Sequence, residues 1–229
     1  MAEARVTFTD EAEFAESITL RLRTNYAIVH LMAAARFSRR VGVIQSEHLN
    51  DGFGDWWDEM LHNAVACLLL TAACLESYAN ELFADRETVF AGIAPHVIDK
   101  VWDLSERGSP LDKLDTAVEL LQKPGFDKKA DLYKAVLAVV RLRNALTHFK
   151  PEWSDEVDKH KKLSDALKGL FQYDDRHFQN EGIFPRAWAG HGCTAWAVNT
   201  VIAFLKQFES QAGLSTRTNW DAFAVRLES

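Results

Sequence analysis

The sequence predicts an all-α protein, arranged as an up-and-down helical bundle of four main helices with extra short helices. Apolar residues recur at helical spacing in several long segments, most clearly over residues 57–86. Runs in which apolar β-branched residues alternate with polar ones are few, and the chain holds only 5 prolines. These observations favour helix over strand along most of the chain.

The composition limits both the number of domains and the class of protein. A chain of 229 residues with 48% hydrophobic residues can bury one substantial core, so we expect a single domain over residues 1–229. The formal net charge of −7 argues against a protein that coats nucleic acid without sequence preference, although a small basic cleft remains compatible with it.

The opening residues are polar and acidic and do not resemble a secretory signal. The longest apolar run, residues 64–75, is too short to cross a bilayer. The 3 cysteines are an odd number, which favours reduced thiols over a disulfide framework. We therefore expect a cytoplasmic protein without a membrane partner.

The first helix is predicted from Asp10, where Asp10 and Glu13 form a pair like a capping box, to Arg40. In this interpretation Arg36, Arg39 and Arg40 lie in its last turn, where positive charge is favourable.

The second helix, residues 57–86, is apolar nearly all round over residues 64–75, which is typical of the central helix of a bundle. The later segments follow from the same periodicity and from the turns between them. We expect short helices over 95–104 and 110–122, a strong helix over 131–149, an exposed helix over 154–169, an irregular stretch over 172–192 and a closing helix over 194–208.

The strongest candidate for chemistry is the end of the helix predicted over residues 131–149. This segment brings together Arg141, Arg143, Asn144 and His148. Arginine binds phosphate through two parallel hydrogen bonds, and histidine can move a proton near neutral pH. The set therefore suits cleavage of a phosphodiester.

A helical wheel, which advances about 100° per residue, separates the two arginines. Arg143 falls in the middle of the apolar side and Arg141 on the opposite side. A guanidinium on a buried stripe is costly unless it is paired or faces a wet cleft. His148 has the phase of Arg141 and Asn144 rather than that of Arg143. Which arginine accompanies His148 is left open by the sequence.

A purely structural interpretation also fits these residues. A histidine in the last turn, just before Lys150 and Pro151, is ordinary helix termination. Arg143 could then pair with a carboxylate such as Glu76.

Other kinds of site have little support. The chain contains no HExxH or paired CxxC motif, and His191 with Cys193 is too little for zinc, so we expect no metal. Neither a dinucleotide loop nor a phosphate-loop lysine motif occurs, so we expect no cofactor. Cys67 and Cys74 are expected in the core.

The segment Arg143-Asn144-Ala145-Leu146-Thr147-His148 matches the motif of the HEPN superfamily (higher eukaryotes and prokaryotes nucleotide-binding): arginine, a polar residue, three residues, then histidine. The segment LLTAACLESYANELFADR is similar to the second helix of that family, where Glu76 follows small residues and Asn80 lies one turn on. The closing FPRAWAGHGCTAWAVNTVIAFLKQF resembles the last helix of bacterial members. The resemblance spans the three strongest helical regions.

The resemblance implies an all-helical, metal-independent endoribonuclease of toxin or antiphage-defence type, with RNA as substrate and an antitoxin protein as a further partner. It implies a homodimer that brings two copies of the motif into one cleft. It also allows an alternative, a catalytically inactive helical binding module or regulatory scaffold.

By this resemblance His148 would transfer the proton and Arg143 would hold the phosphate. Asn144 would orient one of them, with Glu76, Asn80 and Arg141 as supporting residues. The product would be a 2′,3′-cyclic phosphate, so DNA would be spared because it lacks the 2′-hydroxyl.

Overall fold

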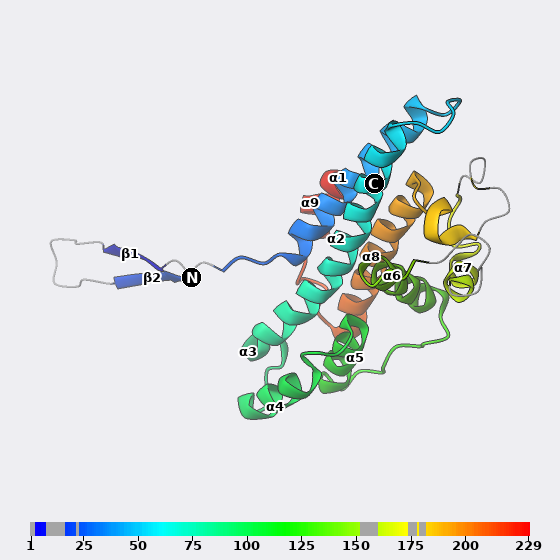
Figure 1. The fold of residues 1–229 in the computed structure, drawn as a ribbon. Helices are drawn as coiled ribbons and strands as arrows, with labels where there is room; N and C mark the ends of the chain where they lie inside the picture. The colour runs from blue at the N-terminus through cyan, green and yellow to red at the C-terminus, as the bar shows by residue number, and fades with distance from the viewer. Residues whose placement is uncertain (1–2, 8–16, 22, 152–159, 174–177, 179–181) are drawn as a thin grey trace.

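The chain is all-α apart from one short N-terminal hairpin. The computed structural model describes residues 3–7, 17–21, 23–151, 160–173, 178 and 182–229, here called the described residues. The two strands, β1 (Glu3–Thr7) and β2 (Ser17–Arg21), pair antiparallel with Glu3 opposite Arg21, and lie outside the helical body (Figure 1). The prediction of an all-α protein is confirmed.

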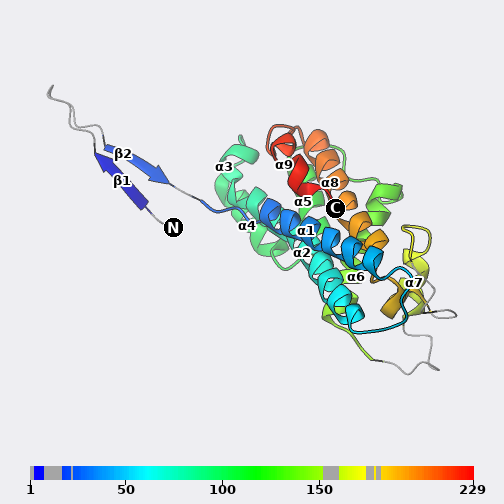
Figure 2. The ribbon, with the colours of Figure 1, turned by 90° about the horizontal axis from the view of Figure 1, so that it is seen from above.

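Four long helices build the core: α1 (Ala27–Glu47), α2 (Trp56–Ala84), α6 (Asp131–Thr147) and α8 (His191–Ala212). Helix α1 packs on α2 and α8, and α6 packs on the same two helices. Figure 2 shows α1 lying over α2, with α8 beside them. In Figure 1, α1, α2 and α8 lie side by side, whereas α6 is strongly foreshortened. The finer prediction of an up-and-down four-helix bundle is therefore not confirmed.

Shorter helices complete the fold. They are α3 (Arg86–Val89), α4 (Pro95–Ser105), α5 (Pro110–Leu120), α7 (Lys161–Leu167), the turn η1 (Ile183–Ala187), in which Phe184 is extended, and α9 (Trp220–Leu227). Helix α5 begins as its sequence suggests: the Ser109 hydroxyl accepts a hydrogen bond from the Asp112 N–H, and Pro110 occupies the first turn. Helix α8 ends at Gly213, whose φ of 75° suits glycine.

Helix α2 is the central helix, as predicted, and packs against α1, α5, α6 and α8. Leu68, Leu75 and Leu82 are fully buried, as are Cys67 and Cys74. Among the described residues, α2 is also the one helix long and apolar enough to span a membrane, a test that the core helix of a soluble protein passes equally well.

The prediction for the first helix is wrong at both ends. Helix α1 begins at Ala27, and Ser17–Arg21 is a strand; Asp10 and Glu13 lie outside the described residues. A distant carboxylate sets the start of the helix, because Glu81 of α2 accepts hydrogen bonds from the N–H groups of Tyr26 (2.7 Å) and Ala27 (2.9 Å).

Because α1 continues to Glu47, its three arginines lie in mid-helix rather than in the last turn. Arg40 pairs instead with Glu59 of α2 at 2.6 Å, and Arg39 donates to the carbonyl oxygens of Arg226 and Glu228 at the end of the chain.

The later part of the chain differs in two places. Within 154–169 the described helix is α7 alone, and residues 154–159 lie outside the described residues. The stretch predicted as irregular, 172–192, is irregular in most of its described residues, and it buries Ile183, Phe184 and Trp188 in the core. Helix α9 was not predicted; it packs against α1.

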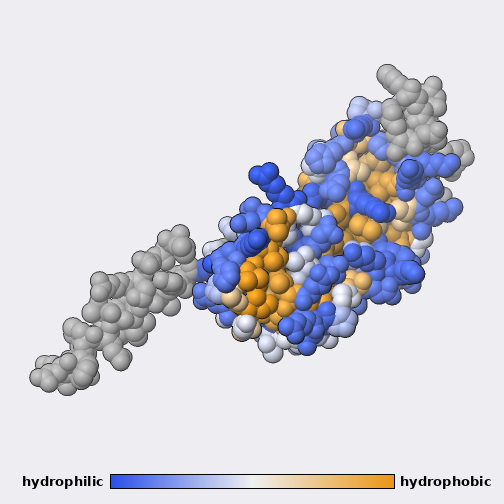
Figure 3. All heavy atoms as spheres, turned by 90° about the horizontal axis from the view of Figure 1, so that it is seen from below, coloured by the Kyte–Doolittle hydropathy of each residue, from blue (hydrophilic) through white to orange (hydrophobic). Residues whose placement is uncertain are grey.

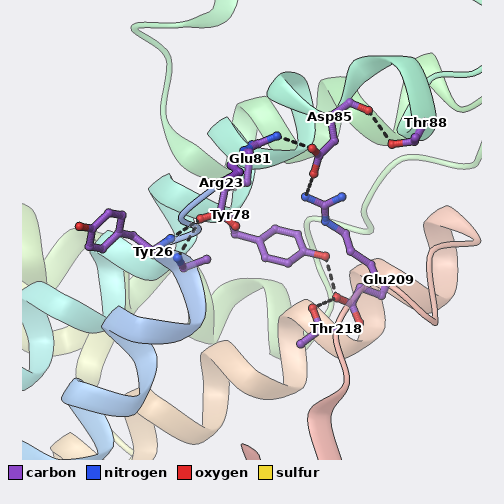
Figure 4. A network of polar contacts seen from close by, with 10 residues as sticks. Arg23, Tyr26, Tyr78, Glu81, Asp85, Thr88, Glu209 and Thr218 are labelled. Carbon is purple, nitrogen blue, oxygen red and sulfur yellow. Dashed lines mark hydrogen bonds and ion pairs between the residues drawn. The ribbon is translucent and has the colours of Figure 1, made fainter. Parts of the chain in front are cut away.

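A network of polar contacts fastens the C-terminal segment to α2 and α8 (Figure 4). Glu209 of α8 is 1% exposed and accepts hydrogen bonds from the hydroxyls of Tyr78 (2.7 Å) and Thr218 and from the indole N–H of Trp220 (2.7 Å). Asp85, at the end of α2, binds Arg23 and Arg217. The C-terminal segment is thus held by buried polar contacts as well as by apolar packing.

The face seen from below carries apolar side chains in two areas (Figure 3). The area nearer the hairpin lies where Figure 1 places α4 and α5. On α4, Ile98 is buried, whereas Val97 is exposed and Leu104 is 82% exposed. Helix α4 therefore packs through one face and leaves apolar residues of the other in solvent.

Candidate functional site at the end of helix α6

The candidate residues lie at the C-terminal end of α6, which packs against α2, α7 and α8. The helix ends at Thr147, and His148 is its C-terminal cap residue, with φ −113° and ψ 38°. The His148 N–H donates to the Asn144 carbonyl at 2.9 Å, and the Thr147 hydroxyl donates to the Arg143 carbonyl at 3.0 Å. Pro151 prevents the helix from continuing, because it lacks an N–H and restricts the residue before it.

The last turn of α6 is half in the core and half in solvent. Ala145 and Leu146 pack against the core, whereas Asn144 and His148 are exposed. The end of the helix therefore presents its polar side chains to solvent.

The two arginines differ as the helical wheel predicts. Arg141 is exposed, and Arg143, on the side that faces the core, is half-buried. Arg143 is therefore the residue whose position needs an explanation beyond solvation.

The side chains of Arg143 and His148 make no hydrogen bond or ion pair with any described residue. Glu76 does not pair with Arg143, so that part of the structural interpretation is wrong, whereas His148 does end the helix as the same interpretation expects. Among the described residues, Arg86 alone has a buried side-chain nitrogen or oxygen without a hydrogen bond, so no nitrogen of the Arg143 side chain is both buried and unpaired. The nitrogens of Arg143 therefore reach solvent, and their donors are available to a ligand.

One chain does not bring Arg143 and His148 face to face along the helix. They are five residues apart, which places them about 140° apart around the axis and about 7.5 Å apart along it. Arg141 has nearly the phase of His148 but lies two turns away, about 10 Å along the axis. Within one chain, neither arginine therefore lies directly beside His148 on this helix.

A pair of aromatic rings lies beside this helix end. Phe149 follows His148, and its ring stacks on that of His160, which precedes α7, with 5.5 Å between centroids and 10° between planes. The His160 Nε2 lies 3.1 Å from the Lys150 carbonyl oxygen. Phe184 of η1 lies edge-on to both rings. Sequence reasoning missed this cluster, because it depends on a contact between segments on either side of residues 152–159.

Glu76 and Asn80 bind a buried lysine instead. Lys113 of α5 is 1% exposed, and its ammonium group donates to the Glu76 carboxylate and to Asn80 Oδ1 at 3.1 Å. The ammonium group also lies 5.3 Å from the centre of the Trp102 ring. The burial of Lys113 was not predicted, since lysine is mostly a surface residue.

The cysteines do not offer nucleophiles. Cys67, Cys74 and Cys193 are free and buried. Burial raises the pKa of the Cys67 thiol to about 12 and that of Cys193 well above its ordinary value. Such thiols stay protonated near neutral pH and are unreactive.

At the end of α6, the described residues offer no set of metal ligands. The described part of the chain contains no cluster of three or more histidine, cysteine, aspartate or glutamate side chains placed to hold a metal ion.

Comparison with known proteins gives no relative: no protein family matches the chain, and neither a curated protein nor a solved structure does. Any assignment of function must therefore come from the residues and their geometry.

Proposed function

We propose that this protein is a metal-independent endoribonuclease that cleaves RNA through a 2′,3′-cyclic phosphate at a cleft formed by Arg143 and His148. One observation carries the proposal: a half-buried guanidinium and an exposed imidazole, neither with a side-chain partner among the described residues, lie at the same helix end. An unpaired guanidinium whose nitrogens reach solvent has donors free to bind an anionic ligand such as a phosphate.

The residues divide the reaction between them. His148 removes the proton from a ribose 2′-hydroxyl, and the resulting oxygen attacks the adjacent phosphorus. The bond from phosphorus to the 5′-oxygen breaks, and a protonated imidazole supplies the proton that this leaving oxygen needs. Arg143 binds the non-bridging oxygens, on which negative charge grows in the transition state. Asn144, exposed one turn before His148, is placed to donate a hydrogen bond to the phosphate or to the imidazole.

The second imidazole is expected from a second copy of the chain. In one chain the helical repeat directs Arg143 and His148 to different sides, so a cleft between two copies of α6 would bring both kinds of group together. Two-fold symmetry would then supply one histidine as base and the other as acid. A homodimer, a role as a toxin or defence effector, a cytoplasmic location and a neutralising antitoxin protein belong to the same proposal.

Cleavage of RNA in excess chelator tests the proposal. We expect the wild-type protein to release fragments that end in 2′,3′-cyclic phosphate, and His148→Ala to lower the rate by about 10²- to 10⁴-fold, the range for loss of a general acid or base. His62→Ala and Arg36→Ala are matched controls, because both side chains are exposed on other helices. Circular dichroism checks that each variant is folded.

The two arginine variants decide whether Arg143 or Arg141 holds the phosphate. If Arg143 holds the phosphate, Arg143→Ala loses more activity than Arg141→Ala. The reverse order would assign the role to Arg141. Wild-type protein that cleaves no RNA, or cleaves it equally well as His148→Ala, would contradict the proposal.

The alternative is an inactive binding module, which the separation of Arg143 and His148 within one chain favours. It predicts that RNA is bound and released intact. Stable dimers that do not interact with RNA would instead indicate a scaffold.

A further inference from the structure

The exposed ring of Phe149 is fixed in place. Phe149 is 46% exposed, although one of its faces is stacked on His160. The buried ring of Phe184 contacts both rings, with centroids 6.0 Å from Phe149 and 4.9 Å from His160. The contact between His160 and the Lys150 carbonyl ties the same two segments together. The ring is therefore supported by aromatic contacts with two other segments, while much of its surface stays exposed.

A flat ring with one accessible face accepts another flat ring by stacking. Lys150, Lys161 and Lys162 are exposed on the described segments that carry Phe149 and His160, and their ammonium groups can bind a phosphate. Stacking on an aromatic ring combined with nearby cations is how proteins bind the unpaired bases of single-stranded nucleic acid. A base that is paired inside a duplex cannot present its face in this way.

We infer that Phe149, supported by His160, stacks the nucleobase of a nucleotide next to the phosphate bound at Arg143 and His148, and that the substrate is single-stranded RNA. The position relative to the scissile phosphate rests on the proposed function. The binding of the base itself does not, and can be measured without cleavage.

The test uses a short single-stranded 2′-O-methyl RNA that contains 2-aminopurine. This oligonucleotide cannot form the cyclic phosphate, and its fluorescence falls when the base stacks. We expect wild-type protein to quench the signal on binding and Phe149→Ala to weaken binding by about 5- to 150-fold, the range for loss of one base–aromatic stack. Phe149→Trp should bind like wild type, because it keeps a flat ring. Tyr26→Ala is the matched control, since Tyr26 is an exposed aromatic residue at the start of α1.

Phe149→Leu separates loss of stacking from loss of folding, because it keeps an apolar side chain at this position and removes the flat face. Weaker binding by both Phe149→Ala and Phe149→Leu, each folded, supports the inference. Unchanged affinity in the folded leucine variant, or wild-type binding to a duplex as tight as to the single strand, overturns it. If binding depends on Phe149 but natural RNA is not cleaved, the base-binding site is supported and the nuclease proposal is contradicted. If cleavage depends on His148 but the affinity is unchanged in the Phe149 variants, the nuclease proposal is supported and the base-binding site is contradicted.

Discussion

Replacing Glu209 tests whether one buried carboxylate holds the C-terminal segment to the helical body. Its two oxygens accept hydrogen bonds from Tyr78 of α2 and from Thr218 (Figure 4), and from Trp220 beyond α8. In Glu209→Ala, the hydroxyl of Tyr78, a residue only 2% exposed, is left without its acceptor. An unsatisfied buried donor costs about 1–3 kcal/mol. Thr218 and Trp220 are half-buried and can turn to water, so each lost bond adds about 0.5–1.5 kcal/mol.

We therefore expect Glu209→Ala to lower the free energy of unfolding by about 2–6 kcal/mol, a large part of the stability of an ordinary domain. Urea denaturation followed by circular dichroism measures this. Tyr78→Phe removes only the hydroxyl and should cost less, about 1–2 kcal/mol. Because both changes break the same bond, the double variant should lose less than the two single variants together. A loss below about 1 kcal/mol in Glu209→Ala, or strict additivity, would refute this reasoning.

Two further predictions concern stability and the core. Burial raises the pKa of the cysteine thiols in the folded protein above that in the unfolded chain. The free energy of unfolding should therefore fall as pH rises from 9.0, the ordinary thiol pKa, towards about 12, the raised pKa of Cys67. A thiol reagent at pH 8 should label these cysteines only at the rate of unfolding, and rapid labelling of the native protein would contradict their burial. In Gly192→Ala the new Cβ would lie 2.0 Å from the backbone oxygen of Gln172, so we expect the free energy of unfolding, measured in urea, to fall by about 1–3 kcal/mol. Gly52→Ala is the control and should change little, because nothing lies within 4 Å of its new Cβ. Equal stability of the two variants would contradict this prediction.

Elements whose signals are local could be predicted from the sequence. Helix α2 follows from an apolar surface nearly all round, and the start of α5 follows from Ser109 and Pro110. The start of α1 could not be predicted, because its N–H groups are capped by Glu81, which lies 55 residues from Tyr26 along the chain. The burial of Trp188 likewise depends on tertiary packing, since the preceding turn η1 is interrupted by extended Phe184 and has no repeat that a sequence pattern could indicate.

The candidate site divides in the same way. The helical wheel separates half-buried Arg143 from exposed Arg141, because phase along a helix is a local property. The neighbours of the site are not local. His160 reaches Phe149 across a contact between segments, and Glu76 is held by Lys113 rather than by an arginine. A sequence pattern indicates which face a residue occupies, but not which distant residue meets it there.

The central claim is that RNA is cleaved at one cleft to which two chains each contribute His148. The most direct measurement is the cleavage rate, in chelator, of mixtures of wild-type protein and His148→Ala at constant total concentration, after the subunits have exchanged. If each cleft needs both histidines, the rate falls with the square of the wild-type fraction, and an equal mixture retains about a quarter of the activity. A rate that falls in direct proportion, with about half retained, would show that each chain acts alone and would contradict the shared cleft.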